Sequence, residues 1–272
     1  MTNIDILIPV HVTNDTVNDY LDKAIESVVN AQKYYEHGKL NITVVCPSSV
    51  TNGIKEVLSK WENMVQISCF INNGNTDFCS QVNAVVLSDN FMGSEYFSIL
   101  EFDDEYAPKW FKMAHDYYYG NEDVSIFLPV NTCIDPTGAW QFGNEMVLAT
   151  SFSNNIGFID FDCLENCSTF NLTGAIFNTN DFRQIGGYKP SIKVAFNYEL
   201  LLRMTSKDLK VYVVPKEGYY HRIGRPDSLI DEYSKTLTDE EISKYFDLAK
   251  REYTYKEDRN KSISQAAPEE LK

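Results

Sequence analysis

The sequence predicts an α/β fold with a mostly parallel central sheet and helices on both of its faces. Across residues 1–106, short apolar runs rich in Ile and Val alternate with longer runs whose apolar residues recur every three or four positions. This alternation is typical of parallel, doubly wound sheets. A chain of 272 residues of which 43% are apolar can bury a core between such a sheet and its helices.

The predicted elements of the first half follow this alternation. Buried strands are expected over residues 4–10, 41–47, 65–71 and 96–102. Amphipathic helices are expected over residues 15–35, 49–61 and 77–87. In such a sheet, ligands bind beyond the carboxyl ends of the strands, so the residues that directly follow a strand are candidates for a binding site.

The second half is less regular. It predicts helices over 107–119, 180–186, 196–206 and 238 to about 255, strands over 124–130 and 210–215, and short strands and loops over 131–167. We expect one domain over residues 1–255, with halves 1–106 and 107–255, and a frayed polar tail over 256–272.

The net charge and the search for targeting signals determine which partners and which cellular location are expected. The net charge of −15 disfavours binding to phosphate backbones and anionic membranes, unless a local basic patch is present. No apolar run is long enough to span a bilayer and no secretory leader is recognisable, so no membrane anchor and a cytoplasmic location are expected. The six cysteines lack zinc-site spacing, which predicts free thiols.

Four carboxylates lie at the end of the fourth predicted strand and directly after it: Glu101, Asp103, Asp104 and Glu105. On an extended segment, alternate residues point the same way, so Glu101 would converge with Asp103, and Asp103 with Glu105. Clustered carboxylates need a counter-charge, which a hard cation such as Mg²⁺ or Mn²⁺ supplies while it also binds a diphosphate. The alternative is that these acids precede a helix that begins at residues 107–108, where the helix dipole favours them.

Several aromatic residues of the second half could stack on a sugar or a base, although most are expected in the core: Trp140, Phe142, Phe152, Phe158, Tyr219 and Tyr220.

Four segments together resemble the family-2-like glycosyltransferases with the GT-A fold, over residues 4–228. They are residues 6–11; Asn73-Gly74 with Asn83; residues 99–108; and residues 171–177 with Phe182 and 185–188, which read N-L-T-G-A-I-F and I-G-G-Y. The last block is the most specific, because both its order and its spacing are kept.

The resemblance implies a role for each matching residue. Asp103 and His221 would bind Mn²⁺ or Mg²⁺, Asp104 would lie beside the transferred sugar, and residues 1–106 and 107–255 would form nucleotide-binding and acceptor-side halves. Thr173 and Gly174 would contact the acceptor. The nucleotide-sugar donor, with UDP the expected nucleotide, would be held by Pro9, His11, Asn83, Glu101, Arg222 and Arg225.

Two positions depart from the family pattern. Residues 46–49 read C-P-S-S in place of an acidic turn that contacts the base, which leaves Asp77 as a substitute. Asn197 occupies the position of the general base, and a neutral amide cannot accept a proton there. Glu199 or another acid could act instead, the enzyme could retain configuration, or the acceptor could need no base. Glu199 could equally pair with Arg203 four residues on.

The sequence therefore predicts a metal-dependent glycosyltransferase, hexosyl or pentosyl, with an unidentified acceptor. The compact length and the expected lack of a membrane anchor also resemble phage enzymes that modify hydroxymethylated bases in DNA, while glycan, lipid-linked and protein acceptors stay open. A non-catalytic module that binds a nucleotide sugar or glycan is the alternative, because fold does not establish activity. Nucleotidyl transfer is disfavoured because residues 9–13 lack a Gly-rich basic loop.

Overall fold

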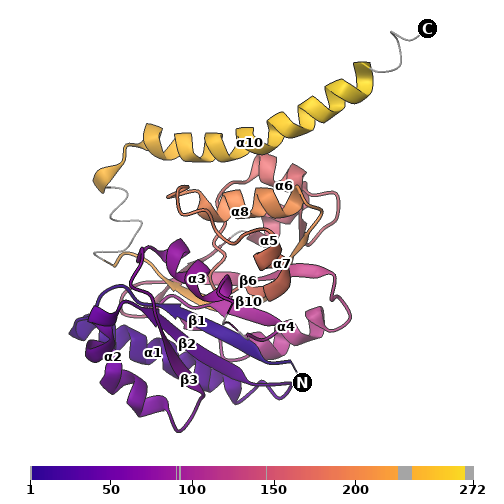
Figure 1. Ribbon diagram of the computed structural model, residues 1–272. Helices are drawn as coiled ribbons and strands as arrows, with labels where there is room; N and C mark the ends of the chain where they lie inside the picture. Colours follow the sequence, from indigo (N-terminus) through magenta and orange to yellow (C-terminus); the bar gives the residue numbers. More distant parts are fainter. Residues whose placement is uncertain (1, 90, 92, 145, 226–234, 267–272) are drawn as a thin grey trace.

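The computed structural model describes residues 2–89, 91, 93–144, 146–225 and 235–266. One mixed sheet crosses the molecule, and helices cover both of its faces (Figure 1). The strands are β1 (Ile4–Pro9), β2 (Leu40–Cys46), β3 (Ile67–Ile71), β4 (Tyr96–Ile99), β5 (Glu105–Tyr106), β6 (Val124–Ile134), β7 (Trp140–Gly143), β8 (Phe158–Ile159), β9 (Ile176–Asn178) and β10 (Lys210–Arg222).

The helices are α1 (Asp15–Gln32), α2 (Ser48–Trp61), α3 (Phe78–Val86), α4 (Trp110–Tyr118), α5 (Met146–Ala149), the 3₁₀ turn η1 (Thr150–Phe152), α6 (Phe161–Asn166), α7 (Thr179–Gln184), α8 (Phe196–Thr205) and α10 (Asp239–Ala266).

The sheet has the order β3-β2-β1-β4-β9-β6-β10-β5, with β7 beside β6 and β8 beside β10. Strands β3, β2, β1 and β4 are mutually parallel, and β6 is parallel to β10. Strand β9 runs antiparallel to its neighbours β4 and β6, so those two strands point the same way. The carboxyl ends of β1, β4, β6 and β10 therefore lie toward one edge of the sheet, which confirms the predicted fold class.

Strand β1 is apolar at every position except Asp5, whose carboxylate accepts hydrogen bonds from the Asn41 amide group and from the backbone amide of Ser94. Ile4, Ile6 and Ile8 pack into a core with α1, α2 and α4, whereas Leu7 packs into a second core with α3, α7 and α8 on the other face. Because successive side chains of a strand point to opposite faces, a strand covered on both sides has no polar position to alternate with.

Helix starts follow local capping chemistry. Asn14 accepts a hydrogen bond from the amide of Val17 at 2.9 Å at the start of α1. Before α10, Thr238 donates its amide to Glu241 at 2.8 Å, and Glu241 donates its own amide to the Thr238 hydroxyl at 3.3 Å. This reciprocal capping box confirms the helix start that the sequence predicts.

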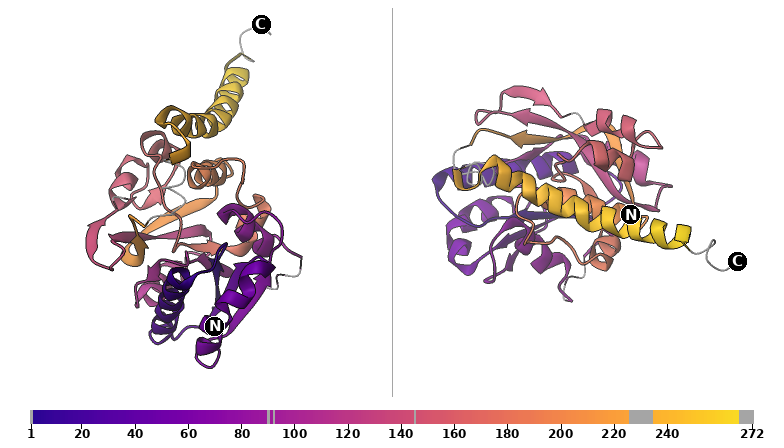
Figure 2. Two further views of the ribbon diagram at one scale, coloured as in Figure 1. Left: turned by 90° about the vertical axis from the view of Figure 1, so that its left-hand side faces the viewer. Right: turned by 90° about the horizontal axis from the view of Figure 1, so that it is seen from above.

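Two predicted element ends in the second half differ from the structure. Strand β10 extends to Arg222, and α10 continues to Ala266, so residues 256–266 are helical, where a frayed tail was expected. Lys, Glu, Arg and Gln are good helix formers, so a polar composition does not end a helix. Figure 2 shows the C-terminal part of α10 extending beyond the body of the molecule.

The expectation that most second-half aromatics are in the core is also only partly right. Tyr219 is fully buried, and Phe158 and Tyr220 are half-buried, but three are exposed: Trp140, Phe142 and Phe152. All six cysteines are free. Among the described residues, no helix has the length and apolar character needed to cross a bilayer.

Candidate functional site

The acidic segment after β4 forms a turn and does not continue the strand. Strand β4 ends at Ile99, and the amide of Asp104 donates to the carbonyl of Glu101 at 3.1 Å. Phe102 and Asp103 are the central residues of this turn. A turn brings its first and fourth residues together, so Glu101 converges with Asp104.

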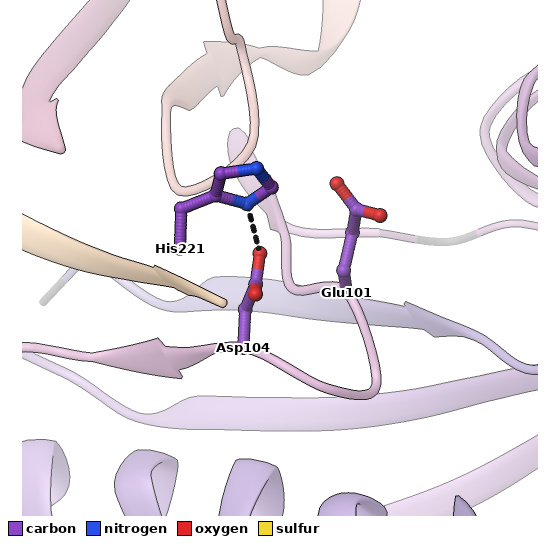
Figure 3. A group of neighbouring side chains, drawn as sticks. All are labelled: Glu101, Asp104 and His221. Carbon is purple, nitrogen blue, oxygen red and sulfur yellow. Dashed lines mark hydrogen bonds and ion pairs between the residues drawn. The ribbon is translucent and has the colours of Figure 1, made fainter. Parts of the chain in front are cut away.

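His221 completes a group of three potential metal ligands with these two acids. One ligand atom each from Glu101, Asp104 and His221 can be chosen so that all lie within 4.8 Å of one another (Figure 3). The Nδ1 atom of His221 and a carboxylate oxygen of Asp104 are 2.9 Å apart. The three residues come from the end of β4 and the end of β10, at the edge where the parallel strands lead.

Arg222 fixes the turn to β10. Its amide donates to Asp104 at 2.7 Å, and its guanidinium donates to the carbonyl of Asp103 at 2.9 Å, to the carbonyl of Asp135 at 3.0 Å and to Glu105 at 2.6 Å. Its side chain is almost completely buried and saturated with hydrogen bonds. Arg222 therefore holds the carboxylates in place, and its contact with a diphosphate stays a prediction.

Arg225 pairs with Asp103 through Nε at 2.7 Å and lies over the ring of Phe102, with 5.1 Å between the guanidinium carbon and the ring centroid. The His11 ring packs edge-on against the same Phe102 at 5.9 Å. A contact between Arg225 and a diphosphate stays a prediction.

The three-residue group carries an excess of negative charge. Burial, together with the charges of Asp104 and Asp103, raises the pKa of Glu101 to about 8. Burial lowers the pKa of His221, but the carboxylates of Asp104, Glu101 and Asp103 outweigh it and raise the pKa to about 9. Among the described residues no ion pair reaches Glu101, whereas Asp103, Asp104 and Glu105 each have one.

The chemistry of this donor set fits a divalent cation. Two carboxylates and an imidazole are suitable ligands for Mn²⁺, and carboxylates also suit Mg²⁺. A cation would supply the counter-charge that Glu101 lacks, and by favouring the ionised carboxylate it would oppose the rise in its pKa.

The predicted pairing of Asp103 with His221 differs from what the structure brings together. The carboxylate of Asp103 lies against Arg225, and Asp104 lies against His221. The reason is the turn, because the expectation assumed an extended segment in which alternate residues share a side. Asp103 as a metal ligand stays a prediction, and Asp104 takes the position beside His221.

Two residues expected to bind the donor have structural roles. Asp77 caps α3, accepting from the amide and hydroxyl of Ser80 at 2.9 and 2.6 Å. Asn83 donates to the carbonyl of Tyr188 at 2.8 Å and accepts from its amide at 2.9 Å, so it joins two segments 105 positions apart. These contacts account for both residues without a ligand.

Pro9 ends β1, and His11 follows it at the same edge of the sheet as the acidic turn. Contact between these two residues and a nucleotide stays a prediction. Their neighbourhood supports it, because Val10 joins β2 through a 2.8 Å hydrogen bond to Val45 and His11 packs on Phe102 beside the acids.

Packing explains why residue 174 is a glycine, which the sequence analysis did not reveal. Its φ is +78°, and a Cβ there would lie 2.4 Å from the ring of Tyr219. Its carbonyl accepts from the indole of Trp110 at 3.0 Å. The close approach that this glycine permits is therefore made by Tyr219, and contact of Thr173 and Gly174 with an acceptor stays a prediction.

Glu199 is fully buried in an ion-pair network. It accepts from Arg203 at 2.9 Å and from the hydroxyl of Tyr253 at 2.7 Å, and it pairs with Lys189 at 2.8 Å. The Arg203 pairing that the sequence left open is confirmed. Because the carboxylate is fully buried and engaged by these three partners, the structure disfavours its contact with an acceptor hydroxyl and hence its role as the base. A side-chain oxygen of Asn197 is buried without a hydrogen-bond partner among the described residues.

Tyr219 and Tyr188 are site residues that sequence analysis missed as such. The Tyr219 hydroxyl accepts from the amide of Glu101 at 3.0 Å, which fixes the start of the acidic turn. The Tyr188 hydroxyl is buried without a described partner, and the charge of Glu101 contributes to its raised pKa, after burial and Cys79. Two features of the sequence could have indicated them: Tyr219 lies two residues before His221, and Tyr188 is the last residue of the I-G-G-Y block.

The mixed sheet, its helical cover and the acidic turn at the carboxyl end of β4 together define a GT-A-like fold. Solved glycosyltransferases share this fold. The chain is similar to TarS of S. aureus, residues 1–349 in complex with UDP-GlcNAc, with a TM-score of 0.64 and 13% identity over 92% of this chain and 65% of that one.

It is also similar to the mannosyltransferase PcManGT of Pyrobaculum calidifontis in complex with GDP-Man and Mn²⁺, with a TM-score of 0.60 and 11% identity over 83% of this chain and 58% of that one. The chain thus spans less than two thirds of either structure. No family model and no curated protein matches the sequence.

Proposed function

We propose that the chain is a metal-dependent glycosyltransferase that moves a sugar from a nucleotide-diphosphate sugar, with UDP as the nucleotide, to a hydroxyl-bearing acceptor. The observation that carries the proposal is the grouping of Glu101, Asp104 and His221 at the carboxyl end of β4. The solved neighbours add support, because they include complexes with UDP-GlcNAc and with GDP-Man and Mn²⁺.

The residues divide the work of this reaction between them. Glu101, Asp104 and His221 would hold the cation, which when bound supplies positive charge to the departing diphosphate. Arg222 and Tyr219 keep the turn rigid, so that the ligands need no reorganisation when negative charge develops. Arg225, partly exposed and over Phe102, is placed to add a second positive charge.

A matched pair of variants tests the proposal. Wild type is expected to gain thermal stability with Mn²⁺ and the correct UDP-sugar, since a ligand that binds only the folded state stabilises it. Asp104→Asn should abolish this shift and lower donor turnover by at least about 100-fold, the usual scale for losing one charge-stabilising group. Asp103→Asn should keep a measurable shift.

The outcomes separate the assignments. If Asp103→Asn loses the shift and Asp104→Asn keeps it, the metal ligand is Asp103. If wild type responds to no nucleotide sugar with Mn²⁺, the proposed function is wrong.

A non-catalytic module that binds a nucleotide sugar is the second candidate. Asn197 at the usual base position and the engagement of Glu199 by Arg203 favour it, because neither offers a free proton acceptor. Release of UDP in the presence of Mn²⁺ distinguishes the two, since a binding module would shift in melting temperature without releasing product.

The proposal leaves hexosyl or pentosyl transfer open. A hydroxymethylated base in DNA and a cytoplasmic location stay predictions from sequence, and the net charge of −15 disfavours a polyanionic acceptor.

A further inference from the structure

Exposed apolar side chains concentrate in one segment of the second half. Among the described residues, six of thirteen exposed large apolar side chains lie within residues 140–156. Two of them are on β7, and one of these, Phe142, is 52% exposed. A concentration of exposed apolar side chains marks a surface that contacts a ligand or a partner, whereas singly exposed ones are ordinary.

The strand register places Phe142 on the face of the metal-ligand group. Phe142 is opposite Cys133 on β6, and Cys133 is opposite His221 on β10. Residues directly opposite each other point to the same face of a sheet, so the three side chains form a row. The charge of Asp104 contributes to the raised pKa of Cys133, after burial, which independently places this row beside the acidic turn. A register shift separates this pair from the next one, in which Trp140 is opposite Ile134.

The spacing of the strands gives the distance between Phe142 and His221. Neighbouring strands are about 4.8 Å apart, so two strand steps place Phe142 on the order of 10 Å from His221. A molecule whose reacting hydroxyl lies at the donor sugar could extend over Phe142.

Strand β7 also borders the loop that precedes β9. Strand β10 occupies one edge of β6, so β9 and β7 share the other edge, at Ile126–Phe127 and 132–134 respectively. The chain that enters β9 carries Thr173 and Gly174, and β7 lies just beyond them along that edge.

We propose that Phe142 forms an acceptor-binding platform, and that the acceptor is a neutral saccharide whose ring stacks on this side chain. This inference rests on the proposed glycosyltransferase function. The apolar ring face of a pyranose suits an exposed phenyl group, and the neutral character follows from charge. Glu101, Asp104 and Glu105 lie along the same edge and the chain carries −15 overall, which repels a polyanion such as DNA.

A binding experiment with a matched control tests the platform. The protein, loaded with UDP and Mn²⁺, is applied to an array of neutral glucose-, galactose-, mannose- and N-acetylglucosamine-containing oligosaccharides, with duplex DNA and anionic-lipid vesicles as further probes. Phe142→Ser is compared with Phe152→Ser, because Phe152 is 53% exposed but lies on η1, outside the row.

Wild type and Phe152→Ser should bind a neutral oligosaccharide, and Phe142→Ser should bind it about tenfold more weakly, the scale of one lost aromatic stacking contact. Equal binding by Phe142→Ser and wild type overturns the platform, as does binding of DNA or vesicles in place of any neutral oligosaccharide, or binding of no probe.

Donor binding is measured separately from oligosaccharide binding. The thermal shift with a UDP-sugar and Mn²⁺ should be the same in wild type and Phe142→Ser, which also shows that the variant is folded. If this shift is absent from wild type, the proposed function fails. If the shift is present but oligosaccharide binding does not depend on Phe142, the platform alone fails.

Discussion

Two buried acidic centres in this chain have opposite charge balance. Glu199 is surrounded by positive groups, with Arg203 at 2.9 Å and Lys189 at 2.8 Å. The turn that contains Glu101 and Asp104 holds more carboxylates than cations among the described residues, and the pKa of Glu101 is raised to about 8. One centre is complete without a ligand, and the other lacks a counter-charge.

The difference teaches how to separate structural from functional acids. A buried carboxylate with all its partners in place contributes to folding, and removal of one partner leaves an unpaired charge. Carboxylates crowded without enough partners reduce stability and persist where a ligand cation makes use of them. The two centres should therefore respond to neutralisation with opposite changes in stability.

The largest effect is expected from Glu199→Gln. The substitution leaves the guanidinium of Arg203 buried without its carboxylate, and loss of one partner of a buried pair costs about 3–5 kcal/mol. Denaturant unfolding should show this decrease, while any folded variant should still bind donor and Mn²⁺.

The matched control is Glu240→Gln, which breaks an exposed pair with Lys244 that has the same four-residue spacing. Surface pairs contribute about 0–1 kcal/mol, so this variant should unfold close to wild type. Equal stability of the two variants would show that the Glu199 network is not a stabilising centre.

A smaller effect is expected from Tyr253→Phe, which removes one hydrogen bond from the same centre. The hydroxyl of Tyr253 donates to Glu199 at 2.7 Å and joins α10 to α8. A hydrogen bond to a charged group contributes about 1.5–3 kcal/mol. Tyr245→Phe on the same helix is the control, since no hydrogen bond of its hydroxyl occurs among the described residues. If both variants unfold alike, the Tyr253 bond contributes nothing measurable.

The parallel half of the fold could be predicted from sequence because its signal is periodic. Residues 4–10 and 15–35 predicted β1 and α1 to within a few positions, since a strand buried on both faces and a helix buried on one have distinct patterns. The end of β10 was missed because its residues after Val214 alternate irregularly between buried and exposed positions.

The site was predicted only in part. His221 and the acids of residues 101–105 were identified as a group, but the sequence did not reveal that Asp104, and not Asp103, lies beside His221, because a turn between Glu101 and Asp104 has no hydrophobic period. The sequence also did not reveal that Asn83 and Arg222 hold distant backbone segments together. Such long-range hydrogen bonds depend on tertiary contacts that no local pattern encodes.

The smallest effect concerns the centre with excess negative charge. Without divalent cations, Glu101→Gln should leave the protein as stable as wild type or more stable, by on the order of 1 kcal/mol, the repulsion between like charges about 4 Å apart in a water-like dielectric. The gain should depend on pH. The pKa of Glu101 is about 8 in the folded protein, above its ordinary value of 4.5, so wild type loses stability as pH rises from 4.5 through 8. The variant lacks this component, and its stability should fall less over the same range.

Urea unfolding in EDTA at several pH values measures this slope, with exposed Glu122→Gln as the control that removes a charge outside the turn. Added Mn²⁺ should reverse the ranking, because the cation stabilises wild type through the ionised Glu101 and the variant offers only an amide. If Glu101→Gln has the same slope as wild type and the same response to Mn²⁺, Glu101 neither carries excess charge nor binds the cation. The contrast between the two acidic centres would then be lost.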